Sequence, residues 1–255
     1  MTVSRPNLSR LSGLAIAAPM ALALASCGGE AEGGDGVITS DPIADIAAPE
    51  GTTWAGTTTI SDQSGYVLGN PDAPIKLVEY ASHTCGACAN FSTTAKPELK
   101  PYIESGVVSF EHRQLIRNSF DLVIATMVQC GAKESMQPLS DQAWTSFNEV
   151  MAGIQANPEG MNATGDLPPN ERFVKIAELG GLTDFFAARG LSADQAKACL
   201  ADTDKIQKIA DASDKQAKEL GVTATPTFFL NDTKLDVNSW DKLEPLLQRA
   251  GARDE

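Results

Sequence analysis

The stretch VEYASHTCGACANF, residues 78–91, decides how this chain is interpreted. A β-type run leads into Cys85-Gly86-Ala87-Cys88, and a run of helix-forming residues follows it. Two cysteines separated by two residues at a strand-to-helix junction are typical of a dithiol that opens and closes as a disulfide. With this spacing, one thiolate attacks a partner disulfide while the second cysteine resolves the product. The stretch therefore predicts a redox dithiol.

The roles of the two cysteines follow from their places on the expected helix. Cys85 should lie at the helix N-terminus, where unpaired N–H groups and the helix dipole stabilise a thiolate. A lowered pKa makes Cys85 more populated as the attacking thiolate and a better leaving group. Cys88, one turn further along the helix, should be more buried and should act as the resolving thiol.

Two other interpretations of the cysteine pair stay open. The pair could be half of a zinc site, which would need two more ligands at a compatible spacing. The chain has only His83 and His112 as histidines and no second Cys-x-x-Cys. The pair could also be an inert structural disulfide. The strand-to-helix position and the expected export of the chain favour the redox interpretation.

The first 26 residues have the pattern of a secretory signal peptide. Two arginines precede an apolar run at 11–24 that is too short and wrongly flanked for a membrane span. The run ends in LASC at 24–27, which resembles a bacterial lipobox, so Cys27 is expected to carry lipid and anchor the protein to a membrane. The alternative is an ordinary signal peptide cleaved after Ala-Leu-Ala at 23–25. The expected location is periplasmic, as a membrane-anchored lipoprotein.

Export would place the chain where disulfides form and persist. Apart from Cys27, four cysteines remain, an even number that suits two pairs. The net charge is −13, and it becomes −15 without residues 1–26, which carry two basic and no acidic residues. This acidity argues against nucleic acid as a partner and against electrostatic adsorption to anionic lipid.

Residues 27–53 are rich in small, acidic and proline residues without periodicity, so we expect a flexible acidic linker. A turn cluster is expected at 69–74. The predicted strands are 57–60, 75–81, 107–110, 227–230 and 234–237. The first predicted helix starts near Cys85, breaks at Pro97 and closes at 105–106. Further helices are predicted at 120–131 with Ser119 as the cap, at 142–154 and at 171–179. The last three are a helix opened by the capping box at 192–195, the helix 204–220 closed by Gly221, and the helix 239–249.

A proline stands directly before a predicted strand in TATPTFFL, residues 223–230. Such a proline can hold a cis peptide in a tight turn. Beside a dithiol it would keep a segment of backbone exposed for pairing with an extended substrate. Taken alone, Pro226 is more simply an ordinary trans proline at the start of a strand. The Cys-x-x-Cys upstream shifts the preference toward a cis proline beside the dithiol.

With these elements the chain resembles the DsbA-like thiol:disulfide oxidoreductases of the thioredoxin superfamily, from about Gly65 to the C-terminus. The resemblance rests on NPDAP at 70–74, EYAS at 79–82, the helical block and TPTFF at 225–229. It implies an α/β thioredoxin fold, a central mixed sheet with flanking helices, interrupted by an all-helical insert. The division that follows is 1–26 signal peptide, 27–53 linker, 54–118 with 221–255 thioredoxin-like domain, and 119–220 helical insert.

The resemblance also implies roles for individual residues. Cys85 is the nucleophile, Pro226 is cis and Thr225 faces the dithiol. Glu79, which shares its strand face with apolar residues, corresponds to a buried acid beneath the site. A raised pKa would let that carboxyl relay a proton to or from the resolving cysteine. A partly exposed charge at the end of the strand is the alternative.

The two remaining cysteines, Cys130 and Cys199, both fall on predicted helices of the insert. The resemblance supports a structural disulfide between them, and two free buried thiols are the alternative. In the chain-entropy model, closing a loop of this length would stabilise the fold by roughly 4 kcal/mol.

Two departures from the family pattern limit the expected chemistry. DsbA itself usually has Pro-His between its cysteines, whereas Gly86 and Ala87 offer no side-chain donor to a thiolate. His83 could partly substitute, but an exposed loop histidine is the simpler interpretation. The family's buried lysine near the acid has no match at 107–113. A less stabilised thiolate predicts a less oxidising couple than that of DsbA.

The leading hypothesis is a lipid-anchored oxidoreductase that makes, reduces or isomerises disulfides in cysteine-containing exported polypeptides. It would need no dissociable cofactor and no metal, but a redox partner in the membrane would have to reset the dithiol. Gly86 and Ala87 tilt the expectation slightly toward a weak oxidase or a reductase. The alternatives are a metal-binding or metallochaperone lipoprotein that uses Cys85, Cys88 and His83, and a non-catalytic interaction module that keeps only the fold.

Overall fold

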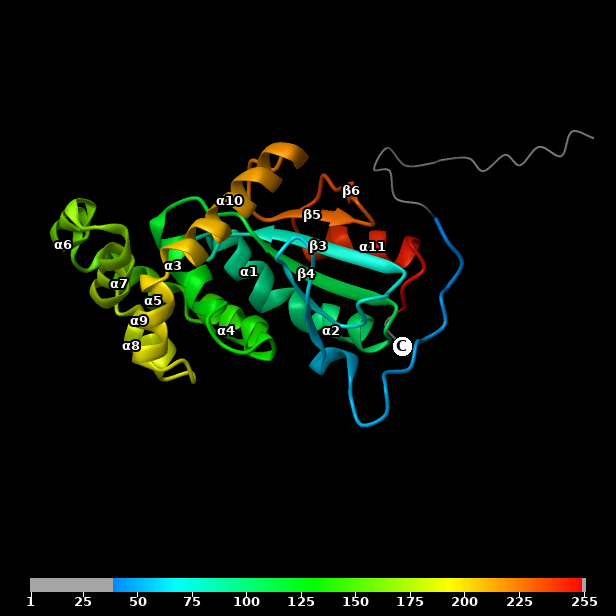
Figure 1. Cartoon of the computed structure of the whole chain (residues 1–255). Helices are drawn as coiled ribbons and strands as arrows, with labels where there is room; N and C mark the ends of the chain where they lie inside the picture. Colours follow the sequence, from blue (N-terminus) through cyan, green and yellow to red (C-terminus); the bar gives the residue numbers. More distant parts are fainter. Residues whose placement is uncertain (1–38, 254–255) are drawn as a thin grey trace, which may run out of the picture. The chain divides into compact units, whose positions relative to one another are not determined.

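The computed structural model describes residues 39–253, and Figure 1 shows their helices and strands. Within them a six-stranded sheet has the order β1-β2-β4-β3-β5-β6, with β3 and β4 parallel and the other neighbours antiparallel. The strands are β1 Thr58–Ile60, β2 Tyr66–Leu68, β3 Ile75–Ala81, β4 Val108–Gln114, β5 Thr227–Leu230 and β6 Thr233–Lys234. The expected mixed sheet is confirmed.

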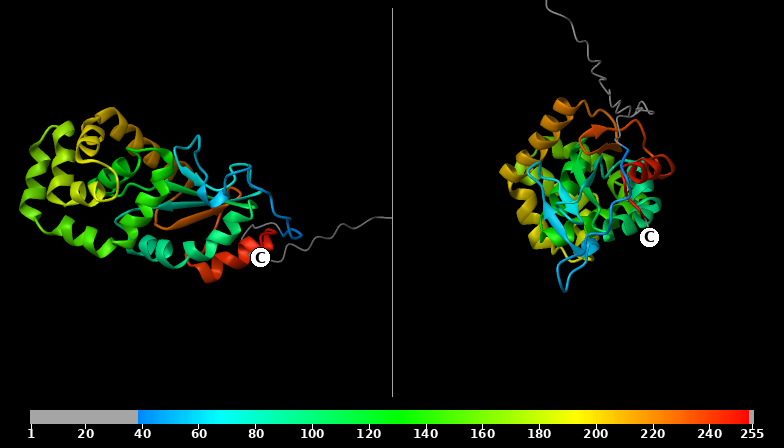
Figure 2. Two further views of the ribbon diagram at one scale, coloured as in Figure 1. Left: turned by 90° about the horizontal axis from the view of Figure 1, so that it is seen from below. Right: turned by 90° about the vertical axis from the view of Figure 1, so that its right-hand side faces the viewer.

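Helices cover the sheet and also form a group of their own. The α-helices of the described part are α1 Gly86–Thr94, α2 Lys96–Glu104, α3 Ser119–Val128, α4 Lys133–Thr145, α5 Phe147–Gln155, α6 Pro158–Ala163, α7 Pro169–Leu179, α8 Leu182–Ala187, α9 Ala193–Ala201, α10 Thr203–Leu220 and α11 Trp240–Arg249. The helices α3 to α10 all occur between β4 and β5 in the chain. Figure 2 shows that α5 to α9 gather beyond one end of the sheet.

The central strand β3 divides its side chains between two apolar layers, because successive residues of a strand point to opposite faces. Ile75 and Leu77 belong to the layer that α1, α2 and α11 complete. Val78 and Tyr80 belong to the layer on the opposite face, which the C-terminal part of α10 contacts. Glu79 alternates with those two residues, so its carboxyl lies on the α1 side of the sheet.

The helices α3 to α9 enclose a second apolar core, to which β2 contributes Tyr66. Cys130, just after α3, and Cys199 in α9 form a disulfide, which confirms the pairing that the resemblance supports. The capping box that opens α9 is confirmed at Ser192, whose side chain accepts from the N–H of the third helical residue. Gly221 closes α10 with a left-handed φ of 61°, as the C-cap pattern predicts.

Two strand predictions are wrong in extent. The strand predicted at 107–110 continues to Gln114, because β3 pairs with it over its whole length and β2 pairs with it at 110–112, so that it is a buried inner strand of the sheet. The strand predicted at 234–237 is reduced to Thr233–Lys234. The sequence analysis also missed β2, whose three residues are too few to show an alternating pattern.

Two helix predictions are wrong in their ends. The helix predicted at 142–154 is the end of α4 followed by α5, because the backbone leaves the helical conformation at Ser146. The cap of α3 is Asn118 and not Ser119. The Asn118 side chain accepts from the N–H groups of Phe120 and Asp121, which satisfies two donors of the first turn.

Residues 39–53 are not the flexible linker that their composition predicts. The Ile43 N–H donates to the Gly251 carbonyl at 2.9 Å, and the Trp54 indole N–H donates to the Ile46 carbonyl at 2.6 Å. Ile43 also packs against the apolar layer that α11 completes. The composition of the segment gives no sign that its isolated isoleucines are partly buried. Their contacts attach the segment to the fold.

The predicted signal segment 1–26, Cys27 and the first part of the predicted linker lie outside the described residues. Within residues 39–253, none of the helices combines the length and the apolar character that crossing a membrane requires.

Candidate active site

Cys85 is the N-cap residue of α1. Its backbone is extended, and its carbonyl oxygen accepts a helical hydrogen bond from the Ala89 N–H at 3.1 Å. The thiol itself is buried, although the two residues that follow it, Gly86 and Ala87, are exposed. The β3 strand therefore ends just before a helix N-terminus that presents the Cys85 thiol beside a short exposed turn.

The pKa of the Cys85 thiol is lowered to about 5. The largest cause is a hydrogen bond with the Cys88 thiol, and the Thr225 side chain and the backbone N–H groups of Cys88 and Ala87 act in the same direction against burial. All these donors favour the thiolate. They replace the side-chain donor that Gly86 and Ala87 lack, which corrects the expectation of a weakly stabilised thiolate.

Cys88 lies one turn inside α1 and is fully buried. The pKa of its thiol is raised, first because it donates to Cys85, and then through burial and the nearby charge of Glu79. The two sulfurs of the motif therefore differ in character. Cys85 is held as a thiolate at neutral pH, and Cys88 keeps its proton.

The segment around Thr225 closes one side of the dithiol. The Thr225–Pro226 peptide is cis, as the resemblance implies. The Thr225 carbonyl oxygen lies 3.4 Å from the Cys85 sulfur and accepts from the thiol. The Thr225 hydroxyl oxygen is buried, and the Thr225 side chain lowers the pKa of Cys85. Residues 140 positions apart in the sequence thus meet at the Cys85 sulfur.

Glu79 is a buried acid on the α1 side of the sheet, and not the partly exposed charge that the sequence left as an alternative. The residue is 1% exposed, and neither carboxyl oxygen has a hydrogen-bond partner within the described residues. Burial raises its pKa to about 7, against an opposing effect of the Lys96 charge. The carboxyl therefore changes protonation near neutral pH, and its charge in turn affects Cys88.

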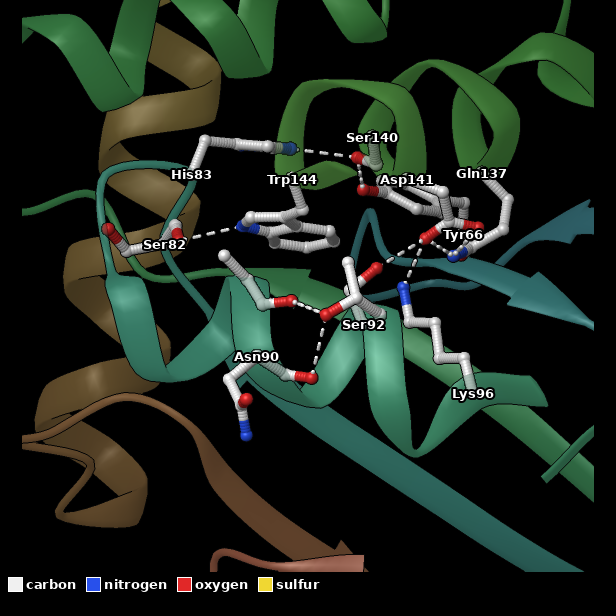
Figure 3. Close-up of polar contacts among 12 residues, drawn as sticks. Tyr66, Ser82, His83, Asn90, Ser92, Lys96, Gln137, Ser140, Asp141 and Trp144 are labelled. Carbon is white, nitrogen blue, oxygen red and sulfur yellow. Dashed lines mark hydrogen bonds and ion pairs between the residues drawn. The ribbon is translucent and has the colours of Figure 1, made fainter. Parts of the chain in front are cut away.

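A lysine does lie near the acid, but α2 supplies it. Lys96 forms an ion pair with Asp141 of α4 at 2.6 Å, and its ammonium lies 4.6 Å from the centre of the Trp144 ring. Figure 3 shows this pair together with Ser92 of α1, whose hydroxyl donates to the same carboxylate at 3.0 Å. Residues 107–113 contain no lysine but include His112, whose Cα pairs with that of Glu79 across the parallel strands β3 and β4.

His83 is a buried side chain, not the exposed loop histidine that its position before the cysteines predicts. Its ring stacks on Trp144 with centroids 4.7 Å apart, and its Nε2 lies 2.8 Å from the Ser140 hydroxyl (Figure 3). Burial lowers the pKa of the imidazole to about 3. His83 is therefore neutral, and its hydrogen bond is made with Ser140 of α4. It is not one of the groups that shift the pKa of Cys85.

Asp121, in the first turn of α3, holds the loop that precedes the nucleophile. One carboxylate oxygen accepts from the Ser82 hydroxyl at 2.8 Å and from both the N–H and the hydroxyl of Thr84 at 2.9 Å. The other oxygen accepts from the Arg117 N–H at 3.0 Å. The sequence analysis missed this residue. The pattern Asn118-x-x-Asp121 at a helix start was its only local signal, and such a pattern ordinarily indicates capping.

The described residues contain no group of three or more histidine, cysteine and acidic side chains placed to hold a metal ion. The metal alternative would have needed His83 beside the two cysteines, whereas the histidine bonds to Ser140. Cys85 and Cys88 are both free thiols in this structure.

The titration of the thiols gives a direct test of this geometry. We expect ultraviolet absorbance of the reduced protein to report one thiolate with a midpoint near pH 5. Because the pKa of Cys85 is lower in the folded than in the unfolded chain, its stabilising effect is complete above the unfolded value and is lost as the pH falls through 5. The reduced form should therefore lose stability relative to the oxidised form across that interval. A midpoint near pH 9 would contradict the assigned donors.

Solved structures with a similar fold come from disulfide enzymes. A protein-disulfide isomerase from Novosphingobium aromaticivorans superposes with a TM-score of 0.67 at 25% identity, over 71% of this chain and 94% of that one. The alpha-DsbA1 of Wolbachia pipientis superposes with a TM-score of 0.61 at 22% identity, over 75% and 93% of the two chains. The second likeness concerns the fold alone, and together they bear out the thioredoxin fold with its flanking helices.

Sequence relatives and a family model agree with the fold. A Rickettsia bellii protein, whose name provisionally assigns it to the protein-disulfide oxidoreductases, is 28% identical over 74% of this chain, which covers 65% of that protein's length. The disulfide bond formation protein D of Bacillus subtilis is 23% identical over 72% of this chain and 75% of its own. The family model described as thioredoxin matches residues 61–249. Since that match covers well over half of the sequence, the chain belongs to the thioredoxin family.

Proposed function

We propose that this protein is a thiol:disulfide oxidoreductase that exchanges disulfides with cysteine-containing polypeptides. The observation that carries the proposal is the asymmetry of its dithiol. Cys85 is a stabilised thiolate at the N-terminus of α1, and Cys88 is a protonated thiol directly behind it. The names of the relatives from Rickettsia bellii and Bacillus subtilis support the same class of reaction.

The exchange proceeds through a mixed disulfide. In the reducing direction the Cys85 thiolate attacks one sulfur of a substrate disulfide, and the other substrate sulfur leaves as a thiolate. Cys88 then gives its proton to the Glu79 carboxylate and attacks the Cys85 sulfur, which expels the second substrate sulfur as a thiolate and leaves a Cys85–Cys88 disulfide. The two substrate thiolates take up protons from water. Oxidation of a substrate is the reverse sequence. An extended substrate would lie beside Thr225, whose backbone is within 3.4 Å of the nucleophile.

The direction of exchange depends on how strongly the reduced form is stabilised. The pKa of about 5 for Cys85 lies between the values of about 7 for thioredoxin and 3.5 for DsbA. A stabilised thiolate makes the disulfide a stronger oxidant. We therefore propose a couple of intermediate potential, more oxidising than thioredoxin, in place of the weak oxidase or reductase that Gly86 and Ala87 favour by themselves.

The proposed setting is outside the cytoplasm. The signal-like segment 1–26 and the lipobox cysteine Cys27 support export and a lipid anchor, and the disulfide between Cys130 and Cys199 suits an oxidising compartment. In that setting the substrates are exported polypeptides, and a redox partner in the membrane resets the dithiol. The anchor can be tested by mass spectrometry of the purified protein, with Cys27→Ser as the control.

The exchange is tested by trapping. A Cys88→Ala variant should accumulate mixed disulfides between Cys85 and substrate polypeptides, because no resolving thiol remains. Non-reducing electrophoresis followed by mass spectrometry would identify the adducts, and they should disappear on reduction. A Cys85→Ala/Cys88→Ala variant is the matched control. The absence of any adduct with the single variant, under conditions where the reduced wild-type protein reduces insulin, would sink the proposed order of attack.

The proton relay through Glu79 makes a separate prediction. In the reducing direction, the resolving step should accelerate as the pH rises through about 7, because ionised Glu79 is the proton acceptor for Cys88. Glu79→Gln should remove that inflection in stopped-flow measurements and slow the step above pH 7.

Since the folded pKa of Glu79 exceeds the unfolded value, its contribution to stability is complete below about pH 4.5 and is lost as the pH rises through 7. The unfolding free energy of the variant should lack this pH dependence; an unchanged pH profile of resolution would argue against the relay.

A further inference from the structure

Three polar residues form one row across the face of the sheet that α1 covers. Glu79 of β3 pairs with His112 of β4, and His112 pairs in turn with Tyr66 of β2. Residues paired across neighbouring strands present their side chains on the same face, and such strands lie about 4.8 Å apart. None of the three residues is more than 1% exposed. Glu79 therefore lies beside a buried imidazole to which the proposed exchange reaction assigns no part.

The ring of His112 is held on its faces, whereas its nitrogens are left to pair. The ring stacks on Tyr66 with centroids 4.7 Å apart and meets Trp144 edge-on at 5.2 Å. Neither ring nitrogen has a well-formed hydrogen bond within residues 39–253. Burial lowers the pKa of the imidazole well below its ordinary value, against a smaller opposing effect of the Gln114 side chain two positions along β4. The ring is therefore neutral and carries one N–H donor and one acceptor nitrogen.

The Glu79 carboxyl needs the donor that this imidazole carries. Both of its oxygens are buried without a hydrogen-bond donor in the described part of the chain. A buried carboxylate without a donor is among the costliest polar groups in a protein. Rotation about the side-chain bonds of two paired residues can bring an N–H of His112 to one of these oxygens. The other nitrogen can then accept from the Gln114 amide, which has a second hydrogen besides the one directed at the Tyr66 hydroxyl at 3.4 Å.

We propose that His112 is a positioning residue for Glu79, whose ionised carboxylate it holds toward Cys88 by donating an N–H. This role rests on the proposed function, because it matters only if Cys88 passes its proton to that carboxylate. A hydrogen bond to the charged form of an acid favours that form. His112 thus makes ionised Glu79 available at a lower pH than burial alone allows. Without the donor, more of Glu79 would be protonated at neutral pH and unable to accept the proton of Cys88.

Other titratable groups also act on Glu79, and their states must be constant where it titrates. Besides burial, the interacting groups are Lys96 of α2, Asp141 of α4, Cys85 and Cys88 of α1 and Tyr66 of β2. Near pH 7, Cys85 is a thiolate, whereas Cys88 and Tyr66 keep their protons. A carboxyl midpoint in this range therefore belongs to Glu79, and its change in a His112 variant reports the loss of the imidazole.

The measurement is a ¹³C NMR titration of the Glu79 carboxyl in the reduced, full-length protein, with Glu79→Gln to identify the signal. The wild-type midpoint is expected near 7. His112→Phe keeps a ring against Tyr66 and Trp144 and removes both nitrogens. Its midpoint should rise by at least about one pH unit, as the loss of a hydrogen bond to a charged group predicts. An unchanged or lowered midpoint in the folded variant would overturn the proposal.

Two conservative variants separate the donor from the packing of the ring. His112→Asn and His112→Gln place an amide N–H near the positions of Nδ1 and Nε2, so one of them should bring the midpoint back toward 7. His83→Phe is the matched control, because His83 is also buried and neutral against Trp144 but bonds to Ser140. Its midpoint should stay near 7. Failure of both amides to lower the midpoint, or an equal rise in His83→Phe, would assign the effect to packing and refute the donor role.

The wild-type protein supplies the test if His112→Phe does not fold. The ¹⁵N signals of the His112 ring should then shift with the same midpoint as the Glu79 carboxyl, and no shift across that midpoint would refute the contact. The failure of this role is distinguishable from the failure of the proposed function. If the protein exchanges no disulfides, the NMR midpoints still decide the contact. If it does exchange them, the pH inflection of the resolving step should move with the carboxyl midpoint in His112→Phe, and an unmoved inflection would remove His112 from the reaction.

Discussion

Replacing Cys85 by serine is expected to abolish disulfide exchange, with at least about a thousandfold loss of rate in insulin reduction and in oxidation of a dithiol peptide. Serine keeps nearly the same volume, so the buried N-cap position of α1 is preserved. A hydroxyl with a pKa far above that of a thiol remains protonated beside the same donors, and it forms no disulfide with Cys88. The loss therefore concerns the reaction and not the fold, which circular dichroism and thermal unfolding should show to be intact.

The matched control for this prediction is the second cysteine pair. A Cys130→Ser/Cys199→Ser variant removes the disulfide of the helical region and leaves the dithiol untouched. It should retain exchange activity while its unfolding free energy falls by roughly 4 kcal/mol. Residual exchange in Cys85→Ser that disappears only in the absence of Cys130 and Cys199 would contradict the assignment of Cys85 as the sole nucleophile.

The elements that the sequence predicts well are those determined by neighbouring residues. The strand 75–81 and the helix start at Gly86 were predicted correctly, because an apolar run followed by a change of periodicity is a local property. The capping box at Ser192 and the left-handed Gly221 were correct for the same reason. Each depends on side chains within a few positions of one another.

The environment of the dithiol could not be predicted in the same way, because segments far apart supply it. Lys96 comes from α2 and reaches the neighbourhood of Glu79 only through the packing of that helix on the sheet, so a search along the adjacent strand finds His112 instead. The loop position of His83 predicts an exposed side chain, but α4 covers it with Trp144. The middle residues of the motif, Gly86 and Ala87, indicated a poorly stabilised thiolate, yet the Cys88 thiol, the distant Thr225 and the backbone N–H groups of Cys88 and Ala87 stabilise it.

Asp121→Ala is expected to cause a large loss of stability, because a buried carboxylate joins three segments of chain. The side chain is fully buried and accepts four hydrogen bonds, from Ser82, from both donors of Thr84 and from Arg117. Removal leaves the fully buried Ser82 hydroxyl and the Thr84 and Arg117 backbone N–H groups without this acceptor, and each hydrogen bond to a charged group contributes about 1.5–3 kcal/mol. We expect the unfolding free energy to fall by at least about 3 kcal/mol and the melting temperature by about 6 to 12 °C.

The control for this prediction is Asp184→Ala. Asp184 also lies in the first turn of a helix, α8, but it is exposed, so its loss should change stability by about 0.5 kcal/mol or less.

The functional consequence distinguishes Asp121 from an ordinary buried residue. It fixes the Ser82–Thr84 loop, and the Cys85 N–H donates to the Ser82 carbonyl at 3.2 Å, so loosening the loop should displace the Cys85 sulfur from the donors that stabilise its thiolate. The pKa of Cys85 should then rise from about 5 toward its ordinary value in the reduced variant, measured at a temperature where it remains folded; a variant that loses stability but keeps the thiolate titration would restrict Asp121 to holding the fold.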